Sequence, residues 1–214
     1  MAYSGNVTVG GPPDVRELPG LTVSKVAVGP FDNNAYFLTC RATGETLLID
    51  AANEAGRLLA LGTPSKIVTT HAHQDHWMAL EEVVAATGAR TIAHPRDAEA
   101  LPVPVTDPVE HGDTVTVGET TLEVVHLRGH TPGSVALLLR SPEGPHLFTG
   151  DSLFPGGVGN TQGDAARFTS LFTDVVERIF DRLPDETWVY PGHGKDTTLG
   201  AERPSLPEWE QRGW

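Results

Sequence analysis

Short runs of β-branched and aromatic residues, separated by glycine, proline and asparagine turns, dominate the first part of the chain. They predict strands over residues 21–28, 34–39 and 46–49. A short helix over 54–60, capped by Asn53, should follow. The first twenty residues hold Gly10-Gly11-Pro12-Pro13, so we expect a loosely ordered arm or an edge segment there.

The remaining pattern alternates between strand and helix periods. Strands are predicted over 67–69, 91–93, 114–117, 120–127, 135–140, 146–149 and 187–190, and helices over 77–87 and 95–101. Between residues 102 and 108, three prolines should exclude regular structure. The strongest helix signal covers 165–183, where apolar residues recur at three- and four-residue steps.

Strands followed by one or two helices occur in the first half, and the second half repeats that order. Helices layered over two sheets satisfy this pattern, so we expect an α/β fold in one domain, residues 1–214. The proline-rich tail carries Trp209 and Trp214. These indoles should pack either in the core or on a neighbouring subunit, and the oligomeric state stays open.

Net charge and cysteine content limit which binding partners and which cellular compartment we expect. The formal charge of −13 disfavours nucleic acid and anionic membranes. Cys40, the single cysteine, cannot form an intrachain disulfide and favours a reducing compartment. The first residues lack a basic and apolar leader, and no run is long enough to cross a bilayer. We therefore expect a cytoplasmic protein that acts on a small molecule.

Three histidines and one aspartate gather where a predicted strand gives way to a helix, in Thr70-His71-Ala72-His73-Gln74-Asp75-His76. His71 and His73 are two apart in an extended segment, so their side chains can point the same way. Asp75 and His76 are adjacent at the helix start and cannot easily serve the same ion. The spacing therefore predicts two metal ions rather than one.

Three further polar residues also follow predicted strand ends, namely His130, Asp151 and His193. Strand-end loops commonly carry chemistry, and this set of side chains suits zinc or iron. We expect His130 to complete the site of the first pair, His193 to complete that of the second, and Asp151 to bridge the ions. His126 is a candidate for a supporting role.

With these motifs, the sequence resembles the metallo-β-lactamase superfamily, and more closely its glyoxalase II (hydroxyacylglutathione hydrolase)-like branch. The second similarity rests on residues 148–154, the glycine-rich 156–159, and Pro191-Gly192-His193-Gly194 followed by residues 198–203. The resemblance implies an αββα four-layer sandwich with metals at one sheet edge and the same ligand partition. The branch's C-terminal helical domain, which holds glutathione, is not expected here. Asn160 stands where relatives usually carry arginine, and Trp77-Met78 also departs from their pattern.

The leading hypothesis is a thioesterase in which a hydroxide held by two zinc ions attacks a small-thiol thioester, with Asp75 as the catalytic carboxylate. One alternative is a persulfide dioxygenase with a single Fe(II) on His71, His130 and Asp151. Another is a different hydrolase of the same fold, and a non-catalytic metal-binding protein is the remaining class. The metal's identity and number, the acyl group and the carrier thiol stay open.

Overall fold

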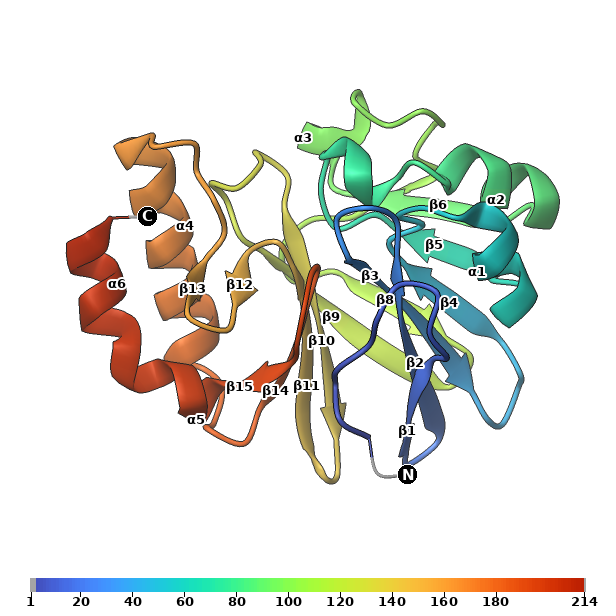
Figure 1. Ribbon diagram of the computed structural model, residues 1–214, viewed down its shortest axis with the longest axis horizontal. Coiled ribbons are helices and arrows are strands. Elements are labelled where there is room, and N and C mark those ends of the chain that lie inside the picture. The colour runs from blue at the N-terminus through green and yellow to red at the C-terminus, as the bar shows by residue number, and fades with distance from the viewer. Residues whose placement is uncertain (1–2, 214) are drawn as a thin grey trace.

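Two β-sheets lie face to face, and helices cover the outer face of each sheet (Figure 1). This computed structural model describes residues 3–213. The helix–sheet–sheet–helix order confirms the expected αββα sandwich. No helix within the described range is long and apolar enough to cross a membrane.

The first sheet has seven strands, whose spatial order follows the chain. They are β1 (Asp14–Leu18), β2 (Leu21–Val28), β3 (Asn33–Cys40), β4 (Thr46–Ile49), β5 (Lys66–Val68), β6 (Arg90–Ala93) and β7 (Asp107–Pro108). Pairing is antiparallel from β1 to β4 and parallel from β4 to β7. Since parallel neighbours run the same way, the ends of β4, β5 and β6 meet at one edge.

The second sheet has six strands in the order β15-β14-β11-β10-β9-β8. They are β8 (Thr114–Val117), β9 (Thr120–His126), β10 (Val135–Ser141), β11 (Gly144–Gly150), β14 (Trp188–Pro191) and β15 (Thr197–Thr198). Strands β9, β11 and β14 run in one direction, because β10 is antiparallel to β9 and β11 while β14 is parallel to β11. Their ends therefore also share one edge.

Two backbone hydrogen bonds tie these two edges together. Asn34 N donates to Gly192 O at 2.7 Å, and Val135 N donates to Thr70 O at 2.9 Å. A small hairpin of β12 (Leu153–Phe154) and β13 (Gly157–Val158) lies beyond the end of β11. The strand ends of both sheets thus form one rim.

Helices cover the two outer faces. On the first sheet lie α1 (Ala55–Leu61) and α2 (Leu80–Thr87), and a 3-10 turn (Gln74–His76) precedes α2. The short α3 (Pro95–Ala98) follows β6. On the second sheet lie α4 (Ala165–Val175), α5 (Leu199–Glu202) and α6 (Leu206–Arg212), with a 3-10 turn (Arg203–Ser205) between the last two.

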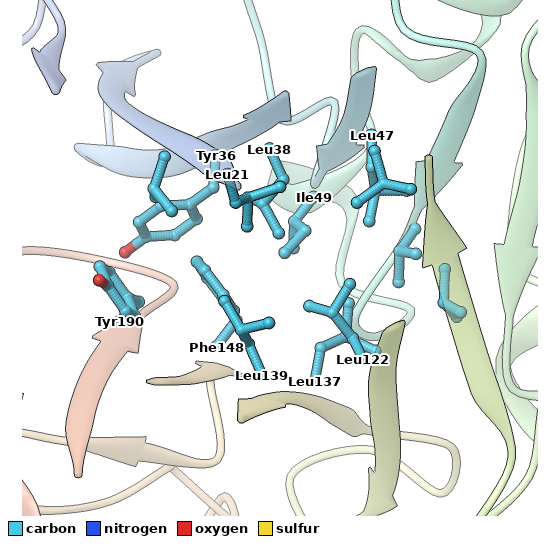
Figure 2. Close-up of a cluster of buried hydrophobic side chains, with 14 of the residues drawn as sticks. Leu21, Tyr36, Leu38, Leu47, Ile49, Leu122, Leu137, Leu139, Phe148 and Tyr190 are labelled. Atoms are coloured by element: carbon cyan, nitrogen blue, oxygen red, sulfur yellow. The ribbon is translucent and has the colours of Figure 1, made fainter. Parts of the chain in front are cut away.

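Three buried clusters fill the three interfaces between the four layers. The central one joins the sheets, and Figure 2 shows Tyr36, Leu38 and Ile49 of the first sheet facing Leu137 and Phe148 of the second. The other two clusters lie beneath the helices on each side. Burial of this apolar surface, at roughly 25 cal/mol per Å², is the main force that holds the layers together.

Several local predictions need correction. Of the two expectations for the first twenty residues, the edge segment is the one found for residues 14–18, because β1 pairs with β2. The proline-rich connection does form a strand, β7, which tolerates Pro108 because it is an edge strand. Asn53 does not cap α1; the N-cap is Glu54, whose backbone N donates to Asn53 Oδ1.

Two helices also differ from their predicted boundaries. Helix α2 begins at Leu80 rather than at residue 77, because the preceding segment turns as a 3-10 helix. The predicted helix over 165–183 is α4 followed by a π-helical turn, Val176–Phe180. In the tail, Trp209 is buried against the second sheet's helices, so it packs within the chain. Trp214 lies outside the described residues.

Candidate metal centre

The seven predicted ligands lie together on the rim formed by the strand ends. Their donor atoms fall into three groups, each within 4.8 Å. We call His71, His73 and His130 the first half-site, and Asp75, His76 and His193 the second half-site; the third group is His71, His76 and Asp151. The grouping follows the partition that the spacing predicts.

The first half-site brings β5 and β9 together. His71 follows β5 and His130 lies in the turn after β9, and their Nε2 atoms are 3.3 Å apart. The ring of His73 lies 4.4 Å from that of His130 and 4.9 Å from that of His71, measured between centroids. Three imidazoles therefore surround one point on the rim.

The second half-site joins the 3-10 turn to the end of β14. His76 Nε2 lies 3.1 Å from His193 Nε2. Asp75 Oδ2 lies 3.4 Å from His193 Nε2 and 3.7 Å from His76 Nε2. Asn33 Nδ2 donates to the same carboxylate oxygen at 2.9 Å and fixes its position.

Asp151, at the end of β11, lies between the two half-sites. Its Oδ2 is 3.6 Å from His130 Nε2 and 3.5 Å from His193 Nε2. Its Oδ1 is 3.3 Å from His76 Nε2. One carboxylate thus faces nitrogens of both groups, as a bridging ligand would.

Hydrogen bonds at the far side of each ring determine which nitrogen carries the proton. The Nδ1 atoms of His130 and His193 lie 2.8 Å from the carbonyl oxygens of Asn160 and Phe31, which can only accept. His76 Nδ1 lies 2.8 Å from the Asp50 carboxylate. In its neutral form, each of these rings therefore carries its proton on Nδ1 and turns Nε2 toward the centre.

His71 also carries its proton on Nδ1 in its neutral form, because Thr70 links this nitrogen to Asp50. Thr70 Oγ1 donates its proton to Asp50 Oδ2 at 2.8 Å, so it can only accept from His71 Nδ1, 3.0 Å away. Asp50 Oδ1 also accepts from Thr70 N. Asp50, which ends β4, therefore orients His76 directly and His71 through Thr70.

Burial and neighbouring charges then divide the histidines by pKa. Burial lowers the pKa of His130 to about 4, and burial together with His76 lowers that of His71 well below 6.5. Burial also opposes a charge on His76, but Asp151 and Asp50 outweigh it and raise its pKa to about 10. Burial would raise the pKa of Asp151, yet His76 and the other histidines hold it well below 3.8.

The donor set fits divalent cations. In their neutral forms, the four oriented rings direct Nε2 lone pairs at one another across 3.1 Å and 3.3 Å, with no hydrogen between them. Asp151 Oδ1 is buried and accepts no hydrogen bond within the described residues. A Cβ at position 192 would lie 2.1 Å from this oxygen, so only glycine leaves it clear. Such a cluster is stable only around positive charge, supplied by protons or by metal.

One side of the centre is open to solvent. His71 and His76 are buried, whereas the side chains of Asp75 and His193 are 27% and 25% exposed. A hollow of about 570 Å³ adjoins His73 and His130. Its other lining residues are Gly129, Thr131, Pro132, Ala166, Arg167 and Ser170. A small molecule can therefore reach the first half-site from this hollow.

Sequence reasoning missed the residues that hold the ligands. Asp50 and Thr70 follow β4 and β5, so the strand-end rule could have found them. Asn33 carried no such signal. The indole Nε1 of Trp77, one of the departures from the branch's pattern, donates to Ala72 O, which anchors the loop between two ligands.

Comparison with known proteins agrees with the fold. Residues 28–193 match the model of the metallo-beta-lactamase superfamily. The chain therefore belongs to that superfamily.

Relatives at moderate identity are known. The chain is 36% identical over 168 residues to a hydroxyacylglutathione hydrolase of Polaromonas sp., which covers 76% of this chain. It spans 62% of the length of that relative. Among solved structures, it is similar to TTHA1623 in a di-iron-bound form, with 37% identity, a TM-score of 0.72 and coverage of 86% of this chain and 98% of that one. It is also similar to ETHE1 from Myxococcus xanthus, with 28% identity, a TM-score of 0.76 and coverage of 88% and 84%.

Proposed function

We propose that the chain is a metal-dependent hydrolase that cleaves thioesters of small thiols. In this proposal the first and second half-sites each hold one divalent ion, and Asp151 bridges the ions. The observation that carries it is the set of four Nε2 lone pairs directed at shared points, 3.1 Å and 3.3 Å apart in pairs. Zinc is the ion that this histidine-rich, partly open set favours.

Divalent ions in such a site lower the pKa of water toward about 7 and polarise a carbonyl oxygen. The chain's own residues would prepare the site for that chemistry. Asp50, Thr70 and the carbonyl acceptors hold the proton of each neutral ring on Nδ1, which leaves Nε2 available to bind an ion. Asp75, held by Asn33, is the more exposed of the two candidate carboxylate ligands and is our candidate catalytic residue.

A thioester is the substrate class that suits these groups. The leaving thiolate has a parent pKa near 8.5, so it can depart without a strong acid. The hollow beside His73 and His130, about 570 Å³, has room for a small thiol ester. Hydroxyacylglutathione hydrolases among the relatives support the same class.

Hydrolysis can be tested with purified protein loaded with zinc. Hydroxyacyl thioesters of glutathione, cysteine and N-acetylcysteine would be supplied, and the free thiol released would be followed by a colorimetric reagent. The matched oxygen esters serve as substrate controls. We expect cleavage of at least one thioester and loss of that activity after chelation.

Two variants test whether the activity depends on the candidate metal centre. Asp151→Asn should remove activity, because the amide offers only one oxygen to the two half-sites. Glu143→Ala changes an exposed residue just before β11, at the opposite end of that strand from Asp151, and should leave activity unchanged. Zinc-loaded protein that cleaves none of the thioesters would refute the thioesterase proposal.

A specific geometry supports a second candidate, a mononuclear Fe(II) persulfide dioxygenase. His71 Nε2, His130 Nε2 and Asp151 Oδ2 lie 3.3, 3.6 and 4.0 Å apart in pairs, as two histidines and one carboxylate on a single ion would. Metal analysis of protein purified without added metal separates the two. Iron near one per chain favours oxidation, and two zinc ions favour hydrolysis.

A further inference from the structure

A buried carboxylate outside the seven candidate ligands joins the two segments that carry the first half-site. Asp97 lies on α3, and its residue is only 3% exposed. Its Oδ2 accepts from Ala72 N at 2.9 Å and from Thr131 Oγ1 at 2.5 Å. Its Oδ1 accepts from Gly133 N at 2.7 Å. Ala72 lies between two ligands of the first half-site, and Thr131 follows the third.

Both oxygens of Asp97 are needed to meet these donors. Ala72 N and Gly133 N approach different oxygens of Asp97, and backbone amides can only donate. An asparagine of the same shape would turn its NH₂ group toward one of these amides. One buried donor would then lose its partner, which costs about 1–3 kcal/mol or forces that segment to move.

The surrounding contacts leave the carboxylate little freedom. A Cβ at position 133 would lie 2.7 Å from Asp97 Cγ, so the turn can approach this closely only with glycine. Next to it, the rings of His94 and His126 stack at 4.0 Å, and His126 Nε2 lies 2.9 Å from Pro132 O. Helix α3 is therefore docked on the His130 turn at two points.

We propose that Asp97 is a positioning residue for the first half-site and not for the second. It would fix the distance between the segment of His71 and His73 and the turn of His130. The second half-site depends on other groups, because Asn33 holds Asp75 and Phe31 O holds His193. This inference rests on the metal-binding part of the proposed function and does not require thioester hydrolysis.

The test measures zinc affinity of each half-site in Asp97→Asn and in the wild-type protein. Competition with a chromophoric chelator gives the affinities, and anomalous diffraction at the zinc edge shows which half-site is occupied. We expect the first half-site to bind zinc about 10–100-fold more weakly in the variant, as for other residues that orient metal ligands. The second half-site should keep its affinity.

Asp196→Asn is the matched control. Asp196 is also a buried carboxylate, with its side chain 1% exposed, but it pairs with Lys25 away from the first half-site. Its substitution should lower the melting temperature without weakening zinc binding at the first half-site. Equal weakening in both variants would mean that loss of stability alone explains the effect, and the inference would be wrong.

Thr131→Val keeps the inference testable if Asp97→Asn does not fold. It removes one of the three donors and leaves the two backbone bonds of Asp97. We expect a smaller loss of affinity, again confined to the first half-site. Wild-type affinity at that half-site, in whichever variant folds, overturns the inference. Wild-type protein that binds no zinc overturns the metal proposal as well, whereas zinc binding without thioesterase activity overturns only the proposed reaction.

Discussion

The Asp50 carboxylate lies 2.8 Å from Nδ1 of His76, and both side chains are buried. The same carboxylate reaches His71 through Thr70 Oγ1. One residue at the end of β4 therefore orients a histidine in each half-site.

Asp50→Asn should weaken zinc binding at both half-sites by about 10–100-fold. The amide cannot accept from Thr70 N, Thr70 Oγ1 and His76 Nδ1 together, so at least one donor loses its partner. Zinc titration with a competing chelator measures the effect, and the exposed Asp181→Asn is the control. Loss at only one half-site would contradict the relay through Thr70.

Zinc titration of the Asp97 and Asp50 variants side by side tests whether each half-site has its own orienting groups. Substitution of Asp97 should affect one half-site, whereas substitution of Asp50 should affect both. If the two variants gave the same pattern, the assignment of separate orienting groups to each half-site would be wrong.

Stability should fall in acid partly because of His146. Burial, helped by Arg16, lowers its pKa to about 4, against about 6.5 in an unfolded chain. The unfolded state therefore binds more protons between these values. The contribution of His146 is fully present above about pH 6.5 and is lost as the pH falls through about 4, for a total of about 3 kcal/mol.

His146→Leu should flatten that part of the pH profile. Denaturant unfolding of the variant and the wild-type protein at several pH values between 4 and 7 measures the difference. The residue lies near the start of β11, at the opposite end of that strand from Asp151, and its Nδ1 lies 2.9 Å from Tyr190 Oη. An unchanged slope in the variant would show that His146 is not the group responsible.

Trp209 should act within the chain rather than at a subunit interface. It is 1% exposed, and its ring lies 6.4 Å from that of Phe180. Trp209→Ala should lower the free energy of unfolding by about 3–5 kcal/mol, because it leaves a cavity beneath α6. Glu210→Ala, an exposed change on the same helix, is the control. A shift in oligomeric state without a loss of stability would contradict this role.

The sequence predicted the seven residues that the structure brings together better than it predicted the residues that orient them. Three histidines and an aspartate stand within six positions, and His130, Asp151 and His193 each follow a strand, so local patterns found all seven. Asn33 and Asp97 contact residues 42, 25 and 36 positions away, and no periodicity records such a contact. Their role depends on which distant segments the fold brings side by side.

The secondary structure was likewise predicted well in regular segments and less well at edges and boundaries. Amphipathic and alternating segments predicted most strands and the long helix of the second half. The edge strand β7 was excluded, and β1 was expected only as one of two possibilities, since short edge strands tolerate proline and exposed residues that weaken the alternation. Helix α2 begins late because the ligand-bearing turn before it takes a 3-10 conformation.

Metal content and metal position test the central claim most directly. The protein would be purified without added metal, analysed by elemental mass spectrometry, and crystallised for anomalous diffraction. The account predicts a divalent ion in each half-site, with Asp151 between them, and loss of both ions on exhaustive chelation. A chain that binds no metal at His71, His130, His76 and His193, yet retains thioesterase activity, would contradict it.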